Sequence, residues 1–554
     1  MKKILMSLVA VLTFAVLTAC GSADPAPPAG GAAAPAPAAG GGGAAAAPAA
    51  AGDEDLVLRF SIAHSQDPRA LPPNEMYFTS AFNARMNAEI DFISIPGEGA
   101  GERVNIMLAS RDLPDVFMGL INRDHIMRHM YDDLFIPVCY YIDNHMPLLT
   151  YVLNQRPQYR AMMIAPDGQI WGFPYIEEMH GLILNQGVLA VNHVWLDNLG
   201  LNMPTNLDEF VYVLRAFRDR DPNGNGLQDE IPFTWAGRDG NKGLGAWANG
   251  NDIGQFMGLW GQADRGDSLY LDANNQIFFT AAHPAFREMN RFFHELFAEG
   301  LIDQEVFNNG GGELSAKLRD GVVGFVINFS LPDRMPAYRF EEFSAVPYMR
   351  SELGIWGTRE NLSEMHRPTT FVITTAMETP LWAALYADGF YDPQTSVEAN
   401  WGPLGYVYVF DENGQMVWGE LQDGFDTFDD MRARHTLGGR QPLAILDHFY
   451  GTVVEYPQNA QLILDHQRDM GFFDYHFESP YIPPLWFTVE EANRLAVLTL
   501  QIYGNTVNPM RRGWIMDGGV DDDWYDYLEL LERNGLPEFL EIMQTAFDRM
   551  RAGL

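Results

Sequence analysis

Residues 219–230 read D-R-D-P-N-G-N-G-L-Q-D-E, and this short stretch decides how we interpret the chain around it. Six of the twelve side chains are Asp, Asn or Glu, and two glycines lie between them. Side-chain oxygens at alternate positions, with glycines that permit a tight reversal, are what a hard cation such as Ca²⁺ needs from a short loop. The stretch therefore predicts a calcium-binding loop, although Pro-Asn-Gly-Asn-Gly would also form a solvated acidic turn without a metal.

Two ligand registers fit this loop. Counting from Asp219 gives an EF-hand-like spacing, which places Gly224 at the sharp turn and Glu230 at position twelve. Counting from Asp221 uses every acidic or amide side chain that follows the proline, and we prefer this register. Its predicted ligands to a structural Ca²⁺, with Leu227 contributing a backbone carbonyl, are Asp221, Asn223, Asn225, Leu227, Asp229 and Glu230.

A predicted helix runs directly into the loop. Thr205 is its expected N-cap, with Asp208 three residues later in a capping-box arrangement. Its apolar side chains recur at helical spacing, and they are Phe210, Val213, Leu214 and Phe217. A bound cation would therefore fasten the end of this helix to the apolar segment 231–233.

Strands and helices alternate in the part of the chain that precedes this helix. We expect strands at 56–62, 90–95 and 113–118, with helices at 77–87 and 103–110. This alternation predicts βαβ units and a parallel sheet. A chain of 554 residues also exceeds what one hydrophobic core supports, so we expect two or more lobes.

The N-terminus has the pattern of a secreted lipoprotein. Lys2 and Lys3 precede an apolar run that is too short for a comfortable membrane span, so residues 1–19 are predicted to be a signal peptide. The run ends in L-T-A-C at 17–20, which resembles a bacterial lipobox and implies cleavage before Cys20 and lipidation of its sulfur. The alternative is an ordinary secretory signal that happens to end at a cysteine.

Residues 20–54 are expected to be a tether, because almost all of them after Cys20 are Gly, Ala or Pro and such a segment cannot bury a core. With about 32 residues behaving as a loose coil, its mean reach is roughly 30 Å. The expected location is therefore the extracellular face of the cell membrane, with the protein held there by its lipid.

The formal net charge of −37 limits the partners of the chain. It argues against nucleic acid and against anionic membrane surfaces bound through a broad basic face. It also disfavours a polyanionic substrate, unless a local basic pocket outweighs the negative electrostatic potential of the rest of the protein.

Several short motifs resemble a known family. They are W-L-D-N-L-G-L at 195–201 with P-T at 204–205, D-P-N-G-N-G at 221–226 with D-E-I-P at 229–232, and D-W at 523–524 with N-G-L at 534–536. These pieces resemble the bacterial extracellular solute-binding proteins of family 1, the lipoproteins of carbohydrate ABC importers. The loop is similar to that of the calcium-containing alginate-oligosaccharide-binding proteins.

The resemblance implies a two-lobe α/β fold of the periplasmic-binding-protein type, with a hinge and a largely helical C-terminal part. It implies a monomer that captures an oligosaccharide between its lobes and delivers it to an ABC permease. In this family the chain crosses between the lobes more than once, and we expect crossings near Pro174, Gly321 and Thr375. The expected N-lobe is 55–174 plus 324–374, and the expected C-lobe is 175–323 plus 375–554.

Sugar binding needs aromatic rings that stack on pyranose faces, and polar side chains that bond the hydroxyl edges. Pockets of this kind lie preferentially between domains, so we look for such residues near the expected crossings. For any single tryptophan, packing in a core is an equally good explanation. The candidates are Trp171, Tyr175, Glu177, Trp235, Trp260, Asn328, Trp356 and Trp401.

No local motif identifies a catalyst, since no nucleophile elbow, zinc-protease motif or P-loop occurs in the chain. Glu177 and Glu178 could be a carboxylate pair for glycoside hydrolysis, but adjacent residues of an extended segment point to opposite faces. We therefore expect a binding protein and not an enzyme. The alternatives are a lipid-anchored polysaccharide-degrading enzyme, and a receptor for peptides or one coupled to a sensor kinase.

Overall fold

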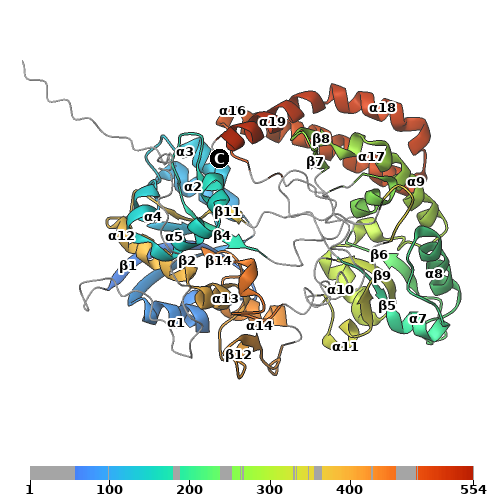
Figure 1. Ribbon diagram of the computed structural model, residues 1–554, viewed down its shortest axis with the longest axis horizontal. Coiled ribbons are helices and arrows are strands. Elements are labelled where there is room, and N and C mark those ends of the chain that lie inside the picture. The colour runs from blue at the N-terminus through green and yellow to red at the C-terminus, as the bar shows by residue number, and fades with distance from the viewer. Residues whose placement is uncertain are drawn as a thin grey trace, which may run out of the picture.

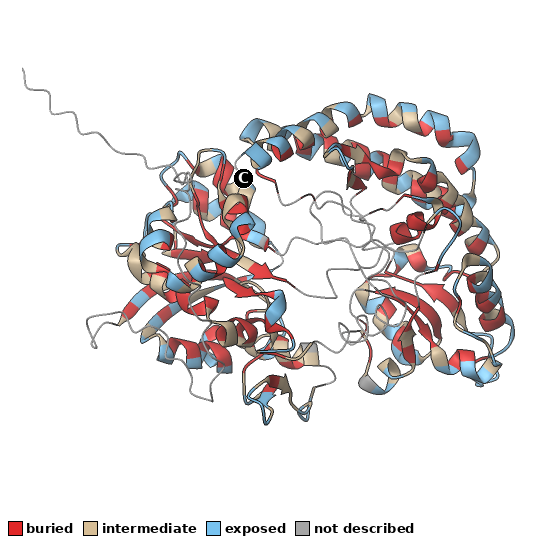
Figure 2. Ribbon diagram, viewed as in Figure 1, coloured by how far each residue is buried: buried red, intermediate tan, exposed pale blue. Residues whose placement is uncertain are grey.

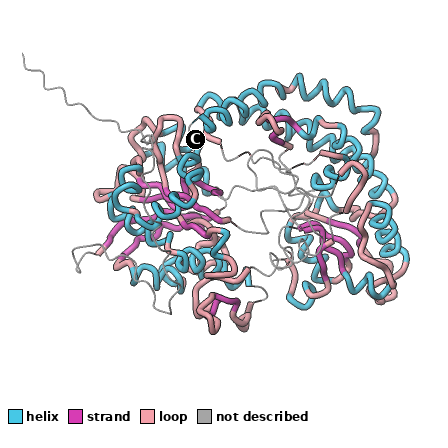
Figure 3. Tube along the Cα trace, in the orientation of Figure 1, coloured by secondary structure: helices cyan, strands magenta, loops and turns pink. Residues whose placement is uncertain are grey.

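The computed structural model arranges the chain in two lobes that lie side by side and are joined across one end by the C-terminal helices (Figure 1). It describes residues 57–552 apart from 98, 179–187, 237–252, 263, 265–267, 329–330, 332–333, 347–348, 355–364, 426–427, 457–481 and 483–484. Strands form the interior of each lobe and helices surround them (Figure 3). Among the described residues, no helix is both long enough and apolar enough to cross a membrane.

The first lobe is built on a six-stranded sheet with the order β14-β4-β11-β3-β1-β2. β1 pairs in parallel with β2 and β3, and β14 pairs in parallel with β4, whereas β11 is antiparallel to both β3 and β4. The predicted α/β fold is therefore confirmed, with one antiparallel strand inserted. The strands are β1 (Leu58–Gln66), β2 (Ala88–Pro96), β3 (Val116–Met118), β4 (Phe173–Glu177), β11 (Met365–Ile373) and β14 (Leu443–Ile445).

Helices from two separate parts of the chain belong to this first lobe. They are α1 (Tyr77–Arg85), α2 (Ala100–Ser110), α3 (Arg123–His129), α4 (Cys139–His145), α5 (Pro147–Gln155), α6 (Pro157–Met163), α12 (Pro380–Asp388), α13 (Pro393–Trp401) and α14 (Phe428–His435). A hairpin of β12 (Tyr408–Phe410) and β13 (Met416–Trp418) lies at its edge. Most residues of β3, β4 and β14 are buried (Figure 2), whereas β2 at the edge of the sheet is mostly accessible.

The second lobe is built on a four-stranded sheet with the order β10-β5-β9-β6. Its strands are β5 (Val188–Asn192), β6 (Ile231–Thr234), β9 (Val323–Asn328) and β10 (Phe343–Ala345), and a separate hairpin pairs β7 (Leu269–Leu271) with β8 (Ile277–Phe279). Its helices are α7 (His193–Leu199), α8 (Leu207–Asp219), α9 (Pro284–Ala298), α10 (Gly311–Asp320) and α11 (Ala337–Phe340).

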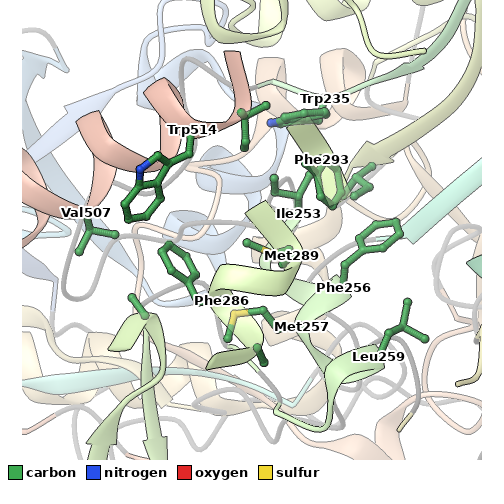
Figure 4. Packing of buried hydrophobic residues seen from close by; sticks show 14 of the residues in the cluster. Trp235, Ile253, Phe256, Met257, Leu259, Phe286, Met289, Phe293, Val507 and Trp514 are labelled. Atoms are coloured by element: carbon green, nitrogen blue, oxygen red, sulfur yellow. The ribbon is translucent and has the colours of Figure 1, made fainter. Parts of the chain in front are cut away.

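The C-terminal part is helical, as predicted, and packs mainly on the second lobe. It consists of α16 (Val489–Thr499), a π-helical segment (Leu500–Val507), α17 (Asn508–Asp517), α18 (Val520–Arg533) and α19 (Leu536–Ala552). Trp514 of α17 and Phe286 of α9 share the apolar core of this lobe (Figure 4). At the other end, the indole Nε1 of Trp486 donates to the carbonyl of Met162 in the first lobe at 3.0 Å. The C-terminal part therefore contacts both lobes.

The strands β9 and β10 lie in the second lobe, and not in the N-lobe as the sequence led us to expect. β9 pairs with β5 and β6, so Gly321 ends α10 within one lobe and no crossing occurs there. The second crossing lies between β10 and β11. No crossing occurs near Thr375 either, because α12, α13 and β14 return to the first core and the chain leaves it only after Val454. The first crossing follows β4, close to the expected position.

The cap of α8 also differs from the expectation by one residue. Asn206 is the N-cap, and its Oδ1 accepts a hydrogen bond from the amide of Glu209 at 3.0 Å. Thr205 instead donates its amide and hydroxyl to the Glu209 carboxylate, both at 2.8 Å. Several residues near the start of α8 can serve as caps, and spacing alone did not distinguish them.

Candidate ligand-binding site and metal loop

Trp401, the last residue of α13, contacts both lobes. Its partly buried indole packs against the main core of the first lobe and against a cluster of the second lobe that includes Ala190, Val326 and Phe343. Its Nε1 donates to the hydroxyl of Tyr450 at 3.0 Å. An aromatic ring is therefore held where the two lobes meet, and the predicted position of Trp401 near a lobe boundary agrees with the structure.

A buried polar network lies directly behind this ring. The Tyr450 hydroxyl donates to Glu177 Oε1 at 2.6 Å, and Asn400 Nδ2 donates to Glu177 Oε2 at 2.9 Å. The Oδ1 of Asn400 accepts from Arg432 and from the Tyr175 hydroxyl, both at 3.2 Å. The network connects β4, α13 and α14, and it fixes the polar groups around the ring of Trp401.

Glu177 is only 1% exposed, and burial raises the pKa of its carboxyl to about 8. The hydrogen bonds from Tyr450 and Asn400 and the positive charge of Arg432 oppose this shift. A carboxyl with this pKa is mostly protonated at neutral pH, so it can both accept and donate a hydrogen bond.

Glu178 leaves β4 on the opposite side. Its carboxylate accepts two hydrogen bonds from Arg156, at 2.7 and 3.0 Å, and one from the Tyr159 hydroxyl at 2.5 Å. The backbone amide of Asp447 donates to it as well, at 2.8 Å. Both glutamate carboxyl groups therefore accept hydrogen bonds from other protein residues, and they do so on different faces of the strand. The expectation that they do not form a hydrolytic pair is consistent with this geometry, because that chemistry needs two carboxyl groups facing one sugar.

Other candidate tryptophans lie inside the cores. Trp235 is 1% exposed and lies beside Phe293 (Figure 4). Its ring also contacts Phe233 and Phe307. Trp171 is buried in the first lobe, where its Nε1 donates to Asp167. The structure therefore corrects the expectation for both, since neither ring is accessible to a ligand. Proximity to the acidic loop suggested Trp235, but the strand β6 directs it into the core.

The remaining candidates differ in their surroundings. Trp260 is partly buried against the core of the second lobe, with its ring 5.7 Å from that of Phe292. Asn328 is buried at the end of β9. Trp356 lies outside the described residues. Sequence reasoning missed Asn400, Arg432 and Tyr450, although Asn400 directly precedes Trp401 in the aromatic, glycine-rich stretch 400–406.

The acidic loop after α8 is organised around Asp221. This residue has a left-handed backbone, with φ at 46°, and its carboxylate accepts from the amides of Asn225 and Gly226 at 3.1 and 3.0 Å. The Nδ2 of Asn225 donates to Asp229 at 3.0 Å. The side chain of Asn198 in α7 donates to the carbonyl of Pro222 at 2.9 Å and attaches the loop to the lobe.

Glu230 provides a test of whether this loop suits a cation. Its Oε1 is buried and has no hydrogen-bond partner among the residues that the structure describes. Burial raises the pKa of its carboxyl, and the negative charges of Asp229 and Asp221 raise it further. A cation would satisfy this oxygen and offset the repulsion, so the residues fit a hard metal ion. Asp219 is directed elsewhere, since it pairs with Arg218 at 2.7 Å. In the part of the chain that the structure describes, no group of three His, Cys, Asp or Glu side chains is close enough to hold a metal by itself.

Comparison with known proteins shows extensive similarity to sugar-binding proteins. The chain is 29% identical over 516 residues to the fructooligosaccharide ABC transporter substrate-binding protein FusA of Streptococcus pneumoniae serotype 4, covering 90% of this chain and 91% of that protein. The structure of FusA in complex with kestose superposes with a TM-score of 0.78 and 28% identity over 90% of this chain and 100% of that one.

Two further structures bear on the fold and on the acidic loop. An EF-hand mutant of FusA in complex with fructo-nystose superposes with a TM-score of 0.77, at 28% identity, over 90% of this chain and 100% of that one. The alginate-binding protein AlgQ2, determined without calcium, shares the fold with a TM-score of 0.64 and 21% identity over 90% of this chain and 99% of that one. No protein-family model matches the chain.

Proposed function

We propose that this chain, which is similar over nine-tenths of its length to an ABC-transporter substrate-binding protein, captures an oligosaccharide between its two lobes and delivers it to an ABC permease. The full-length match to a protein whose structure holds kestose carries the proposal. The chain is a binding protein and not an enzyme.

Trp401 is the centre of the proposed sugar site. An indole between the lobes provides an apolar face on which a sugar ring stacks, and the hydrogen-bonding groups of Asn400, Arg432 and Tyr175 lie beside it. Closure of the two lobes would bury the ligand and bring polar groups of the second lobe to its other face.

The test is a thermal-shift screen followed by calorimetric titration, with kestose and nystose first and other oligosaccharides after them. A ligand present at 100 times its dissociation constant stabilises the protein by about 2.7 kcal/mol. The ligand should be recovered intact by chromatography. Binding of no oligosaccharide, or conversion of the ligand to products, would contradict the proposal.

We also propose that Cys20 carries a lipid and that residues 21–54 tether the protein to the extracellular face of the membrane as a monomer. The apolar run before Cys20 and the Gly, Ala and Pro composition after it support this location. A short flexible tether would keep the binding protein near the permease without restricting its orientation.

Finally, we propose that the acidic loop binds Ca²⁺ through Asp221, Asn223, Asn225, the Leu227 carbonyl, Asp229 and Glu230. The buried Oε1 of Glu230, which has no hydrogen-bond partner in the described part of the chain, supports this assignment. The ion would have a structural role: its charge offsets the repulsion among the three carboxylates. These residues form the connection between the end of α8 and the start of β6.

A further inference from the structure

Positively charged side chains gather beside the proposed sugar site, in a chain whose net charge is −37. They are Arg69, Arg367, Arg432 and Arg440, and they come from the segment after β1, from β11, from α14 and from the loop before β14. The charges of Arg367, Arg432 and Arg69 all act on Arg440. Four guanidinium groups from distant parts of the sequence therefore share one region of the first lobe.

The loop 437–440 brings Arg367 and Arg440 together. Arg440 Nη1 donates to the carbonyl of Leu437 at 3.2 Å, and Arg367 Nη1 donates to the carbonyl of Gly439 at 3.3 Å. The loop packs tightly on the sheet, because a Cβ at Gly119, just after β3, would lie 2.8 Å from the Cβ of Arg440. Both arginines are thus held by backbone contacts of a fixed loop.

This cluster adjoins Trp401. The positive charges of Arg432 and Arg367 both act on the Tyr175 hydroxyl, which donates to Asn400, the residue before Trp401. A Cβ at Gly439 would lie 3.4 Å from the same hydroxyl. The two arginines therefore lie next to the polar network that surrounds the proposed sugar platform.

Among the described residues, two of the four arginines have no carboxylate within ion-pair distance. Arg69 pairs with Asp67 at 3.2 Å and with Asp430 at 2.9 Å. Arg367 and Arg440, by contrast, make only backbone hydrogen bonds with their guanidinium groups among the described residues. Burial and the neighbouring positive charges lower the pKa of Arg440, while Asp67 opposes this shift. Asp67 offsets part of this repulsion from a distance, but no described carboxylate contacts either guanidinium group, and a bound anion in direct contact would stabilise both.

We propose that Arg367 and Arg440 form a subsite for a carboxylate of the bound ligand, so that the protein prefers oligosaccharides containing a uronic acid residue. This inference rests on the proposed function, because it assigns the substrate class of the same site. A planar guanidinium matches a carboxylate in two parallel hydrogen bonds, and Arg367 is exposed enough for a soluble ligand to reach it. This local cluster of positive charges is what an anionic ligand would need in a protein whose net charge is otherwise strongly negative.

The experiment compares trigalacturonate with its methyl ester, which has the same sugar units without the negative charges, and with kestose. Calorimetric titration should show that trigalacturonate binds at least tenfold more tightly than the ester. Arg367→Gln should reduce the affinity for trigalacturonate about tenfold or more, because one charge-assisted contact is lost, and should leave the affinity for the ester unchanged. Arg440→Gln should act in the same direction.

Arg215→Gln is the matched control, because Arg215 is an exposed arginine of the second lobe that pairs with Glu299. It should change neither affinity. If kestose or the ester binds as tightly as trigalacturonate, or if Arg367→Gln weakens neutral and acidic ligands equally, the carboxylate subsite is wrong while the proposed function stands. If no oligosaccharide binds to the wild type, the proposed function fails and this inference fails with it. Because Arg367 is exposed and makes one weak hydrogen bond, its variant should fold even if Arg440→Gln does not.

Discussion

Arg432 lies over the indole ring of Trp401, with its guanidinium carbon 4.6 Å from the ring centroid. Contacts of this kind contribute about 0.5–2 kcal/mol, depending on how far the pair is shielded from water. The same guanidinium also donates to Asn400, so the arginine is held by two neighbouring residues of α13. The ring at the lobe boundary is therefore fixed in one orientation before any ligand binds.

Replacement of this ring should weaken binding with a limited effect on folding. Trp401→Ala is expected to reduce the affinity for an oligosaccharide ligand by about 1–3 kcal/mol, by analogy with the stacking of aromatic side chains on nucleobases. Calorimetric titration measures the change. Trp382→Ala, in α12, is the control, since Trp382 packs against the same core from another helix. Unchanged affinity in a folded Trp401→Ala protein would remove Trp401 from the site.

Glu177 should make stability depend on pH. The pKa of its carboxyl is raised from 4.5 to about 8 in the folded state, so the folded protein binds one more proton than the unfolded chain between these values. Its contribution is fully present below about pH 4.5 and is lost as the pH rises through about 8. Glu177→Gln, which stays neutral, should flatten the fall of the melting temperature between pH 5 and 8. Equal slopes for wild type and variant would show that Glu177 is ionised when buried.

Glu178 should matter for stability and not for binding. Glu178→Gln removes the negative charge that faces the partly buried Arg156, and we expect a loss of about 1–3 kcal/mol in the free energy of unfolding. Because the side chain faces away from the network around Trp401, ligand affinity should change less than twofold. Urea denaturation and calorimetric titration measure the two quantities. A large loss of affinity at unchanged stability would contradict this separation of roles.

Calcium should stabilise the protein through the acidic loop. The melting temperature of the wild type should rise when Ca²⁺ replaces a chelator, and Asp221→Ala or Glu230→Ala should abolish that rise, since each removes a predicted ligand. Asp219→Ala is the matched control and should keep most of the response, because Asp219 pairs with Arg218. If Ca²⁺ does not raise the melting temperature of the wild type, the metal assignment is wrong. If only Asp219→Ala abolishes the rise, the ligands follow the EF-hand-like register that begins at Asp219.

Cys20 should determine where the protein is found. Cys20→Ala removes the sulfur that is predicted to carry the lipid, so the protein should appear in the medium or remain unprocessed. Fractionation of cells and mass spectrometry of the mature N-terminus measure both outcomes. If the variant is cleaved normally and still sediments with membranes, the lipid does not anchor the protein.

The sequence by itself determined the local features. The apolar spacing of α8 and the turn residues that follow it are signals carried by neighbouring residues, and the predicted helix is observed at Leu207–Asp219. The alternation of strands and helices predicted the parallel part of the first sheet. Glu177 and Glu178 were assigned to opposite faces because the direction of side chains in a strand depends only on the backbone.

Tertiary structure alone decided which strands share a sheet and which aromatic rings face the lobe boundary. β9 reads as a buried strand in the sequence, but its hydrogen-bond partners, β5 and β6, are distant segments whose positions no local pattern specifies. Trp235 and Trp401 have the same side chain, so the sequence alone does not tell which one is accessible. Trp235 is covered by α9 within the core of the second lobe, whereas Trp401, at the end of α13, lies where the two lobes meet. Arg69, Arg367 and Arg440 become neighbours only because the chain returns to the first lobe with β11 and stays there through β14. The positive charge that they share therefore exists only in the folded protein.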